Sequence, residues 1–392
     1  MQELCFNSLK LYKRGSSALR VYLYRYFYRD FEIKQEFDCR NGCLYAKNED
    51  TTNRIINTIL IGLNESLTNA LTGKKAKYIN SNTGLPLIGN NAFGIVDRNT
   101  NWIEVKPVTG CNLNCIFCSV DQEKREWDFV VELDYLLEYY NLVASKKSGK
   151  IIAVINSHGE PLIYEPITEL VRGLKRNSKT EKVVLLTNGT LLTKEKLDEL
   201  KNAGLDKINF SVSAVDIETA KRLSGVKNYN IGKILGLIDY ASKNFETLIA
   251  PVYMKGINDE EIEKVVKICA EKNIEAGIQN FLEYKTGRKP AKEISFEKFN
   301  DFLKELEQRH GTKLRDLDFN LQRDKSLDMP FRKNQVVECR ILLPGRMKNE
   351  RIGVVKGISR AISIFNCEKS PGTFVKAKIT RTKHNIFSAV PA

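Results

Sequence analysis

Three cysteines in one short window have the clearest chemical potential in this chain. Cys111, Cys115 and Cys118 lie in the segment TGCNLNCIFCS, residues 109–119, with the spacing C-x3-C-x2-C. Three thiolates on one loop can bind three irons of a cubane cluster and leave the fourth iron open to another ligand. A tetrahedral zinc site would need a fourth protein ligand, but no further cysteine and no histidine is close in sequence. The window therefore predicts a [4Fe-4S] cluster held by these three residues.

The elements around this window predict how the loop is held. From residue 102 to residue 280, short β-rich runs alternate with helical patterns. Six such βα units indicate a parallel sheet wrapped by helices, as a partial or complete barrel, with reactive loops at the carboxyl ends of the strands. The expected strands span residues 102–108, 151–156, 182–187, 207–213, 247–253 and 274–280. The expected helices span residues 128–146, 165–176, 194–202, 231–243 and 259–272, and a further helix, residues 293–309, should place Phe296, Phe299 and Phe302 in the core.

The two ends of the chain differ from this central unit. Residues 20–29 mix basic and aromatic side chains and residues 55–71 have an amphipathic helical pattern, so an α+β accessory domain is expected over residues 1–98. The barrel is expected over residues 99–312 and a polar linker over residues 313–334. Residues 335–392 predict a small closed β-barrel of the oligonucleotide-binding (OB) kind. Its expected strands span residues 336–343, 351–357, 361–366, 374–381 and 385–390.

The charge is divided in the same way. The whole chain carries +14, of which residues 331–392 carry +10, residues 1–100 carry +5 and residues 101–330 carry −1. Basic ends around a near-neutral centre indicate that the ends hold a polyanion while the centre carries out the chemistry.

Composition also bears on the compartment. No run of about 18 apolar residues occurs, and the first residues lack the pattern of a secretory signal, so a cytoplasmic protein without a membrane partner is expected. Nine cysteines is an odd number, and three of them lie within eight residues. This usage favours metal binding in a reducing compartment over disulfide bonds.

The cysteine window follows the first expected strand and has an aromatic residue before its third cysteine, and in both respects it resembles the signature of the radical S-adenosylmethionine (SAM) superfamily. The resemblance covers about residues 100–285 and implies a partial (βα)6 radical SAM barrel. It implies that SAM chelates the fourth iron. One electron, from a donor such as ferredoxin or flavodoxin, then cleaves SAM to a 5′-deoxyadenosyl radical. Phe117 would pack near the adenine.

Later segments are similar to the SAM-binding segments of the same superfamily. In Ser157-His-Gly-Glu-Pro-Leu162, the resemblance implies that Gly159, Glu160 and Pro161 meet the amino group of SAM, while His158 has either a structural role or a substrate contact. Asn188 belongs to an Asn-Gly pair that is either a simple turn or a cofactor contact. Ser211 and Ser213 either meet the SAM ribose or carboxylate or cap the next helix.

The tail resembles a TRAM domain, a β-barrel shared by RNA-modifying enzymes. The resemblance rests on Gly353-Val-Val-Lys-Gly-Ile358 and on the basic run from Ser370 to Asn385. It implies RNA binding, and the candidate RNA contacts are Arg346, Arg360, Arg381 and Lys383, unless these side chains form an ordinary solvated face.

A radical SAM barrel joined to such a tail resembles the tRNA methylthiotransferases, which carry a second cluster on three N-terminal cysteines. Here Cys5, Cys39 and Cys43 are the candidates for that second cluster, and structural thiols are the alternative. Radical SAM methyl synthases that act on RNA offer another model, and in them Cys339 would have to carry a methyl group. The sequence therefore predicts modification of an RNA nucleotide, with tRNA as the expected partner, by methylation or methylthiolation.

Two other interpretations stay open at this point. A radical enzyme that modifies a peptide or protein would use the N-terminal region to bind that peptide and the tail as a scaffold. A non-enzymatic RNA-binding protein would leave the cysteine window unexplained.

Overall fold

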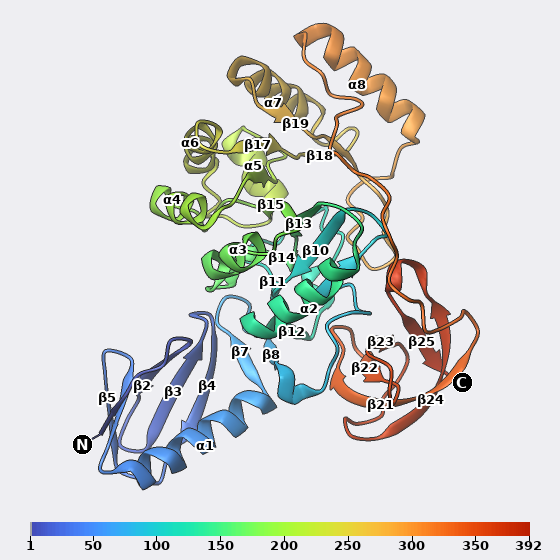
Figure 1. Ribbon diagram of the computed structural model, residues 1–392. Coiled ribbons are helices and arrows are strands. Elements are labelled where there is room, and N and C mark those ends of the chain that lie inside the picture. The colour runs from blue at the N-terminus through green and yellow to red at the C-terminus, as the bar shows by residue number, and fades with distance from the viewer. Residues whose placement is uncertain (1) are drawn as a thin grey trace.

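The computed structural model describes residues 2–392, and its centre is a seven-stranded sheet with the order β19-β17-β16-β15-β13-β10-β9 (Figure 1). Six of these strands are parallel, and β9 (Gly94–Asp97) is antiparallel to its neighbour. The parallel strands are β10 (Trp102–Lys106), β13 (Ile151–Ile155), β15 (Thr180–Thr187), β16 (Lys207–Phe210), β17 (Glu246–Ile249) and β19 (Glu275–Ala276). All five residues of β13 are buried, as expected of an aliphatic strand inside a parallel sheet.

Helices cover one face of this central sheet. Capping residues fix the starts of four of them, since the side chains of Thr193, Asp216, Asn230 and Ser295 each accept a backbone N–H from the first turn. The helices are α2 (Leu133–Lys146), α3 (Ile167–Lys175), α4 (Lys194–Ala203), α5 (Ile217–Ser224), α6 (Ile231–Ser242), α7 (Asp259–Lys272) and α8 (Phe296–His310). Helix α5 was not expected from the sequence. Phe296, expected in the core, is 63% exposed, because it is the first residue of α8.

The N-terminal region forms a second, six-stranded sheet with the order β12-β8-β7-β4-β3-β2, here called the N-terminal sheet. Its strands are β2 (Leu9–Lys13), β3 (Ala18–Leu23), β4 (Phe27–Glu32), β7 (Leu67–Asn69), β8 (Lys75–Ile79) and β12 (Trp127–Val131). Strand β12 lies where a helix was expected from residue 128. Its sequence, Trp-Asp-Phe-Val-Val, is aromatic and β-branched, which favours a strand.

One helix and a small sheet complete this region. Helix α1 (Glu49–Glu65) begins at the cap Asn48 and packs on β4 and β8. The helix expected over residues 55–71 is therefore wrong at both ends, and its last residues form β7. Strands β1 (Gln2–Leu4), β5 (Phe37–Arg40) and β6 (Cys43–Ala46) make a three-stranded sheet beside it.

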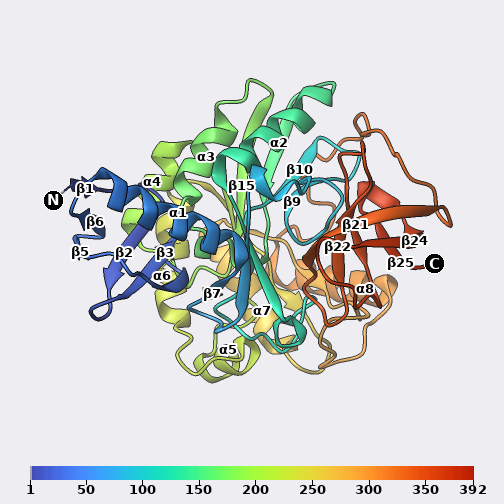
Figure 2. The same ribbon diagram turned by 90° about the horizontal axis from the view of Figure 1, so that it is seen from below.

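The last region is a closed five-stranded barrel with the order β21-β22-β23-β25-β24, here called the C-terminal barrel. Its strands are β21 (Val336–Pro344), β22 (Arg351–Val354), β23 (Ala361–Ile364), β24 (Phe374–Arg381) and β25 (Ser388–Pro391), so the expectation of a small closed barrel is confirmed. Phe331 and Phe387 meet edge to face in its core. Figure 2 shows this barrel and the N-terminal sheet at opposite ends of the molecule.

Residues 312–335 connect the central unit to the C-terminal barrel without a helix or a regular strand. They are nevertheless fixed in place. Arg323 forms an isolated β-bridge with Thr100, and the ammonium group of Lys147 donates to the carbonyl of Lys325 at 2.9 Å. The same ammonium pairs with Asp97 at 2.7 Å, and both of these charged side chains are fully buried.

Within residues 2–392, no helix combines the length and the apolar character needed to cross a membrane.

Asp128 and Arg346 join the three regions. Asp128, on β12, is fully buried and accepts hydrogen bonds from Asn69 and Thr72 of the N-terminal region and from Thr109, just before the cysteine window. The guanidinium of Arg346, from the C-terminal barrel, pairs with Asp128 at 3.3 Å and is itself 3% exposed. The expectation that Arg346 contacts RNA is therefore wrong, because its charge is taken up inside the protein.

Replacing Arg346 with Ala should lower the free energy of unfolding by about 3–5 kcal/mol, because it leaves a buried carboxylate without its cation. Urea titration followed by circular dichroism measures this change. Arg381→Ala, on the exposed end of β24, is the matched control and should change stability by no more than about 0.5 kcal/mol. Equal effects of the two substitutions would contradict the role given to Arg346.

Candidate functional site

The three cysteines of the window line one cavity of about 450 Å³, here called the thiol cavity. It lies at the carboxyl ends of the parallel strands, and its wall also includes Glu160 and Asn188. Parallel strands place their following loops at one edge of the sheet, so residues far apart in sequence meet there. The expected site residues that line it are Cys111, Cys115, Phe117, Cys118, Gly159, Glu160, Asn188 and Ser211.

A close backbone approach joins the loop of Cys111 to the loop of Glu160. Thr109-Gly110 and His158-Gly159 form a short parallel pair, and the amide of Glu160 donates to the carbonyl of Gly110 at 2.9 Å. A Cβ on Gly159 would lie 1.7 Å from that carbonyl oxygen, so only glycine fits here. The glycine of the Gly-Glu-Pro segment therefore positions Glu160 beside the cysteine loop.

Glu160 is a buried carboxylate held by donors from the chain. It accepts hydrogen bonds from the amide of Leu162 at 3.0 Å, the hydroxyl of Thr187 at 2.7 Å and the amide of Asn188 at 2.8 Å. Burial raises the pKa of Glu160 to about 7, although these donors act in the opposite direction. Among residues 2–392 no lysine, arginine or histidine forms an ion pair with it, so a cationic ligand in the cavity would supply the missing charge.

Asn188 links the cysteine loop to the loop after β15. Its side-chain amide donates to Asn112 at 3.0 Å, and Asn112 in turn donates to Thr190 at 2.7 Å. The same amide lies 3.9 Å from the sulfur of Cys111. Asn188 does belong to a turn, because its side-chain oxygen accepts the amide of Thr190 at 3.0 Å, and its side chain also lines the thiol cavity, so that its contact with the cofactor stays a prediction.

Arg288 holds the cysteine loop from outside, and sequence reasoning missed it. Its guanidinium donates to the carbonyls of Asn114 at 2.7 Å and Cys115 at 3.2 Å and pairs with Asp121 at 3.1 Å. Its backbone amide donates to the carbonyl of Cys118 at 2.9 Å. Arg288 lies in the segment Gly-Arg-Lys-Pro, which begins at residue 287 and carries no motif signal. Its role depends on contacts with residues about 170 positions away in the sequence.

The thiols themselves need a cation. Burial and the neighbouring sulfur of Cys118 raise the pKa of Cys115 to about 12, and burial raises the pKa of Cys111. Thiolates at this depth form only with a metal to balance their charge. Among the described residues the three sulfurs do not all lie within 4.8 Å of one another, and no fourth protein ligand brings any of them into such a group, as the ligands of a single zinc ion would require. The donor set thus fits a cubane cluster with one open iron and does not fit a closed zinc site.

The remaining candidates around the thiol cavity have different roles. Phe117 and Ser211 line it, but the hydroxyl of Ser213 accepts the amide of Val252 at 3.0 Å and so holds two strand ends together. Pro161 is buried in the first turn after Glu160. His158 contacts Asn91 at 3.2 Å and does not line the thiol cavity, and burial together with the positive charge of Lys106 lowers its pKa.

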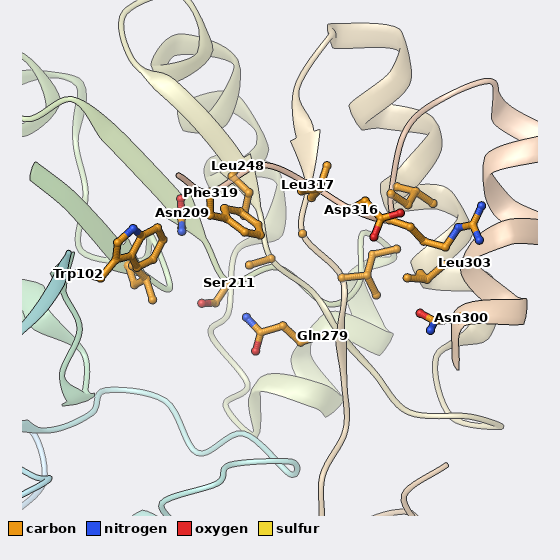
Figure 3. Close-up of a pocket in the computed structure, with 16 residues that line it drawn as sticks. Trp102, Asn209, Ser211, Leu248, Gln279, Asn300, Leu303, Asp316, Leu317 and Phe319 are labelled. Atoms are coloured by element: carbon orange, nitrogen blue, oxygen red, sulfur yellow. The ribbon is translucent and has the colours of Figure 1, made fainter. Parts of the chain in front are cut away.

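A second cavity of about 590 Å³, here called the interior cavity, adjoins the first and lies between the central sheet, α8 and residues 314–319 (Figure 3). Leu186, Ser211 and Gln279 line both cavities. Trp102 and Phe319 pack edge to face in its wall. Trp102 and Asn209 are among the residues that line it, and the indole N–H of Trp102 and the amide oxygen of Asn209 are buried without a hydrogen-bond partner among the described residues.

The structure does not group the N-terminal cysteines as expected. Cys5 and Cys43 form a disulfide, which also corrects the preference for metal binding over disulfides in this region. Cys39 has a free thiol that packs toward the core. Within residues 2–392, Glu3 is the one further side chain with a metal-binding atom close to the sulfurs of Cys5 and Cys43. Strand pairing explains this result, because Leu44 rather than Cys43 faces Cys39 across β5 and β6.

The other expected RNA contacts lie on the C-terminal barrel. Arg360 is half-buried, and its guanidinium donates to Asn385 at 3.2 Å and to the carbonyl of Asp328 at 2.9 Å. It therefore belongs to the packing of the barrel against residues 312–335. Arg381 and Lys383 are exposed.

Comparisons with known proteins bear chiefly on the central unit. Residues 105–269 match the Radical SAM superfamily. An uncharacterized protein of Methanocaldococcus jannaschii is 37% identical over 371 residues, covering 86% of this chain and 85% of that protein. A GTP 3′,8-cyclase of Chlorobaculum tepidum is 26% identical over 250 residues, covering 62% and 73% respectively. The crystal structure of Streptococcus suis SuiB bound to S-adenosylmethionine has a TM-score of 0.46 at 16% identity, covering 79% of this chain and 71% of that one.

Replacing Arg288 with Gln should loosen the cysteine loop without removing a thiol. Iron should still bind after anaerobic reconstitution, but its affinity should fall by about 10–100-fold, as for other supports of metal ligands. The rate of iron loss to a chelator measures this change. Arg315→Gln, which removes the partner of Glu307 away from the cysteines, is the control and should leave the rate unchanged. Equal rates for all three proteins would show that Arg288 does not support the site.

Proposed function

Residues 105–269 form a Radical SAM superfamily domain, and on this premise we propose that the chain modifies a nucleotide of RNA, with tRNA as the expected substrate. The observation that carries the proposal is the junction of the two cavities: the cysteines and Glu160 line one, and an aromatic, partly polar cavity opens beside them. A [4Fe-4S] cluster with SAM supplies a 5′-deoxyadenosyl radical when bound, and an external donor such as ferredoxin or flavodoxin supplies the electron.

Each residue of the thiol cavity has a task in this proposal. Cys111, Cys115 and Cys118 hold the irons, and Arg288 holds their loop. Glu160 accepts hydrogen bonds from a cationic amino group, since it is buried without a cationic partner in the described chain. The side chains of Phe117, Asn188 and Ser211 line the rest of the wall and would bound the adenosyl portion of SAM.

The interior cavity is suited to the base of a nucleotide. Trp102 and Phe319 offer apolar walls, and Asn209, Ser211 and Gln279 place polar side chains in the lining, where the edge of a base needs them (Figure 3). The name of the relative from Chlorobaculum tepidum states that it acts on GTP, a purine nucleotide, which favours the same substrate class here.

The basic ends favour a polymer over a free nucleotide. The C-terminal barrel has the closed five-stranded form of an oligonucleotide-binding fold and resembles a TRAM domain, and its region carries +10. Arg381 and Lys383 remain the proposed phosphate contacts, because their charges face solvent. Arg346 and Arg360 support the barrel from inside.

Methylation and methylthiolation are the two reactions proposed. Cys339, which would carry a methyl group in one scheme, is fully buried in the C-terminal barrel, and Cys39 does not join Cys5 and Cys43 for a second cluster. Analysis of the product therefore has to distinguish a methyl from a methylthio group.

Replacing Glu160 with Gln should weaken SAM binding by about 10–150-fold, the equivalent of about 1.5–3 kcal/mol for a hydrogen bond to a charged group. The cluster should remain, because the substitution removes no iron ligand. Equilibrium dialysis with radiolabelled SAM and iron analysis of the same sample measure both. An unchanged affinity for SAM would show that this carboxylate does not face the amino group.

The proposed function predicts that one modified nucleoside is lost from RNA when the gene is deleted. Mass spectrometry of nucleosides from purified tRNA and rRNA of both strains identifies it, and its mass distinguishes a methyl from a methylthio group. A Cys115→Ser copy should fail to restore the nucleoside, whereas the parent copy should restore it. Identical nucleoside profiles in the two strains would contradict an RNA substrate and leave a peptide or a free nucleotide in its place.

A further inference from the structure

One face of the N-terminal sheet is uncovered over β2, β3 and β4 and at the first residues of β8 and β12, whereas Ile79, Phe129 and Val131, farther along β8 and β12 on the same face, are fully buried. Alternate residues of its strands form a core against α1, among them Leu11, Val21 and Phe27, all of which are buried. The intervening residues point to the opposite face, where no helix packs among residues 2–392. Figure 2 shows α1 on one side of β2 and β3. A sheet face of this kind is free to bind a partner.

A single row of side chains crosses the whole of this face. Strand pairing places them in the order Lys10, Tyr22, Tyr28, Thr68, Lys75 and Trp127, from β2 to β12. Directly paired residues have their Cβ atoms about 5 Å apart. Three aromatic rings and two lysines therefore form one continuous line that spans all six strands.

The rings in and beside this row are accessible and interact with cations. Tyr12 is 49% exposed, and its ring meets that of Tyr22 edge to face at 5.8 Å. The rings of Tyr22 and Tyr28 are 5.5 Å apart, and the guanidinium of Arg20 lies 4.1 Å from the ring of Tyr28, which extends the flat surface.

At the β12 end of the row the lysines surround a tryptophan. The ammonium groups of Lys75 and Lys77 lie 5.7 Å and 5.2 Å from the ring of Trp127. Aromatic rings with interleaved cations are the surface on which unpaired bases stack while lysines meet phosphates.

The charge of the face matches a polyanion. Asp30 neutralises Arg20 through two hydrogen bonds of 2.7 Å each, but Lys10, Lys75 and Lys77 form no ion pair with any carboxylate in residues 2–392. The ammonium of Lys77 also donates to the backbone carbonyl of Glu65, so Lys10 and Lys75 are the lysines available to phosphate groups. A peptide strand would pair with the edge of a sheet and would have no need of this cationic face.

The row ends near the cysteine loop. Trp127 follows the third cysteine of the window by nine positions, and Gln122, between them, lines the thiol cavity. The hairpin from β3 to β4 packs against the segment that follows Glu160 in the central unit. Its turn residues Tyr24 and Arg25 both have positive φ, a strained conformation for these residues, and Tyr24 is buried against Tyr164, which follows Glu160 by four positions.

We infer that this face is a binding platform for a single-stranded segment of RNA. Bases stack on Tyr12, Tyr22, Tyr28 and Trp127, and Lys10 and Lys75 hold the phosphates. Single-stranded RNA is specified because only unpaired bases expose their faces to aromatic side chains. The platform rests on the proposed function, to which it adds a second RNA-binding surface at the other end of the molecule from the C-terminal barrel.

Fluorescence anisotropy with the full chain and a labelled 12-nucleotide oligouridylate tests the platform. Tyr12→Leu, Tyr22→Leu and Tyr28→Leu together keep apolar side chains on the strands but remove the rings. They should weaken binding about tenfold or more, with an unchanged dependence of affinity on salt, since each stacked base contributes measurably. Lys10→Gln and Lys75→Gln together should instead lower the slope of log affinity against log salt by about 0.7 for each phosphate that the lysines no longer neutralise.

A lysine that lies over a tyrosine ring elsewhere on the surface provides the control. Lys194 lies 5.5 Å over the ring of Tyr240 on helices α4 and α6, and Lys194→Gln with Tyr240→Leu should leave oligouridylate affinity at the parent value. Circular dichroism spectra equal to the parent's confirm that the variants are folded. If the parent binds and the tyrosine variant binds equally well, the platform is wrong and the proposed function stands. If the parent binds neither oligouridylate nor tRNA, both are wrong.

Discussion

The arrangement of this molecule depends on a buried ion pair between Asp128 and Arg346. Asp128 contacts the N-terminal sheet and the residue before the cysteine loop, and Arg346 comes from the C-terminal barrel. Either charge alone in this position would be strongly unfavourable, so the pair forms only when all three regions are docked. Burial lowers the pKa of Arg346 to about 10, which still leaves the guanidinium charged at neutral pH. The RNA-binding surfaces proposed at the two ends are thereby held in fixed positions around the thiol cavity.

Hydrogen bonds within the chain hold the loops of the thiol cavity together. One loop supplies three sulfurs, a second supplies Glu160, and a third supplies Asn188, and backbone or amide contacts join each loop to the next. Because these contacts are internal to the chain, Glu160 remains oriented before any ligand arrives. Preorganisation of this kind reduces the ordering that a cofactor must cause when it binds.

Local patterns predicted the parts of the structure that depend on neighbours in sequence. The spacing of Cys111, Cys115 and Cys118 and the strand runs from residue 102 onward are such patterns, and so are the five strands of the tail. Contacts between distant segments could not be predicted in this way: Arg346 was interpreted as a surface cation and Arg288 carried no signal, because each role is set by partners more than 150 residues away. The disulfide of Cys5 and Cys43 follows from the pairing of β1 with β6, which the sequence did not reveal.

The central claim, that RNA is the substrate of the radical chemistry, is tested most directly by SAM cleavage in the presence of RNA. Anaerobically reconstituted protein with a chemical reductant is incubated with tRNA from cells that lack the gene or from cells that carry it, and 5′-deoxyadenosine is measured over time. We predict faster formation of 5′-deoxyadenosine with RNA from the deletion strain, because only that RNA still has the unmodified nucleotide. Equal rates with both RNA samples and without RNA would contradict the account.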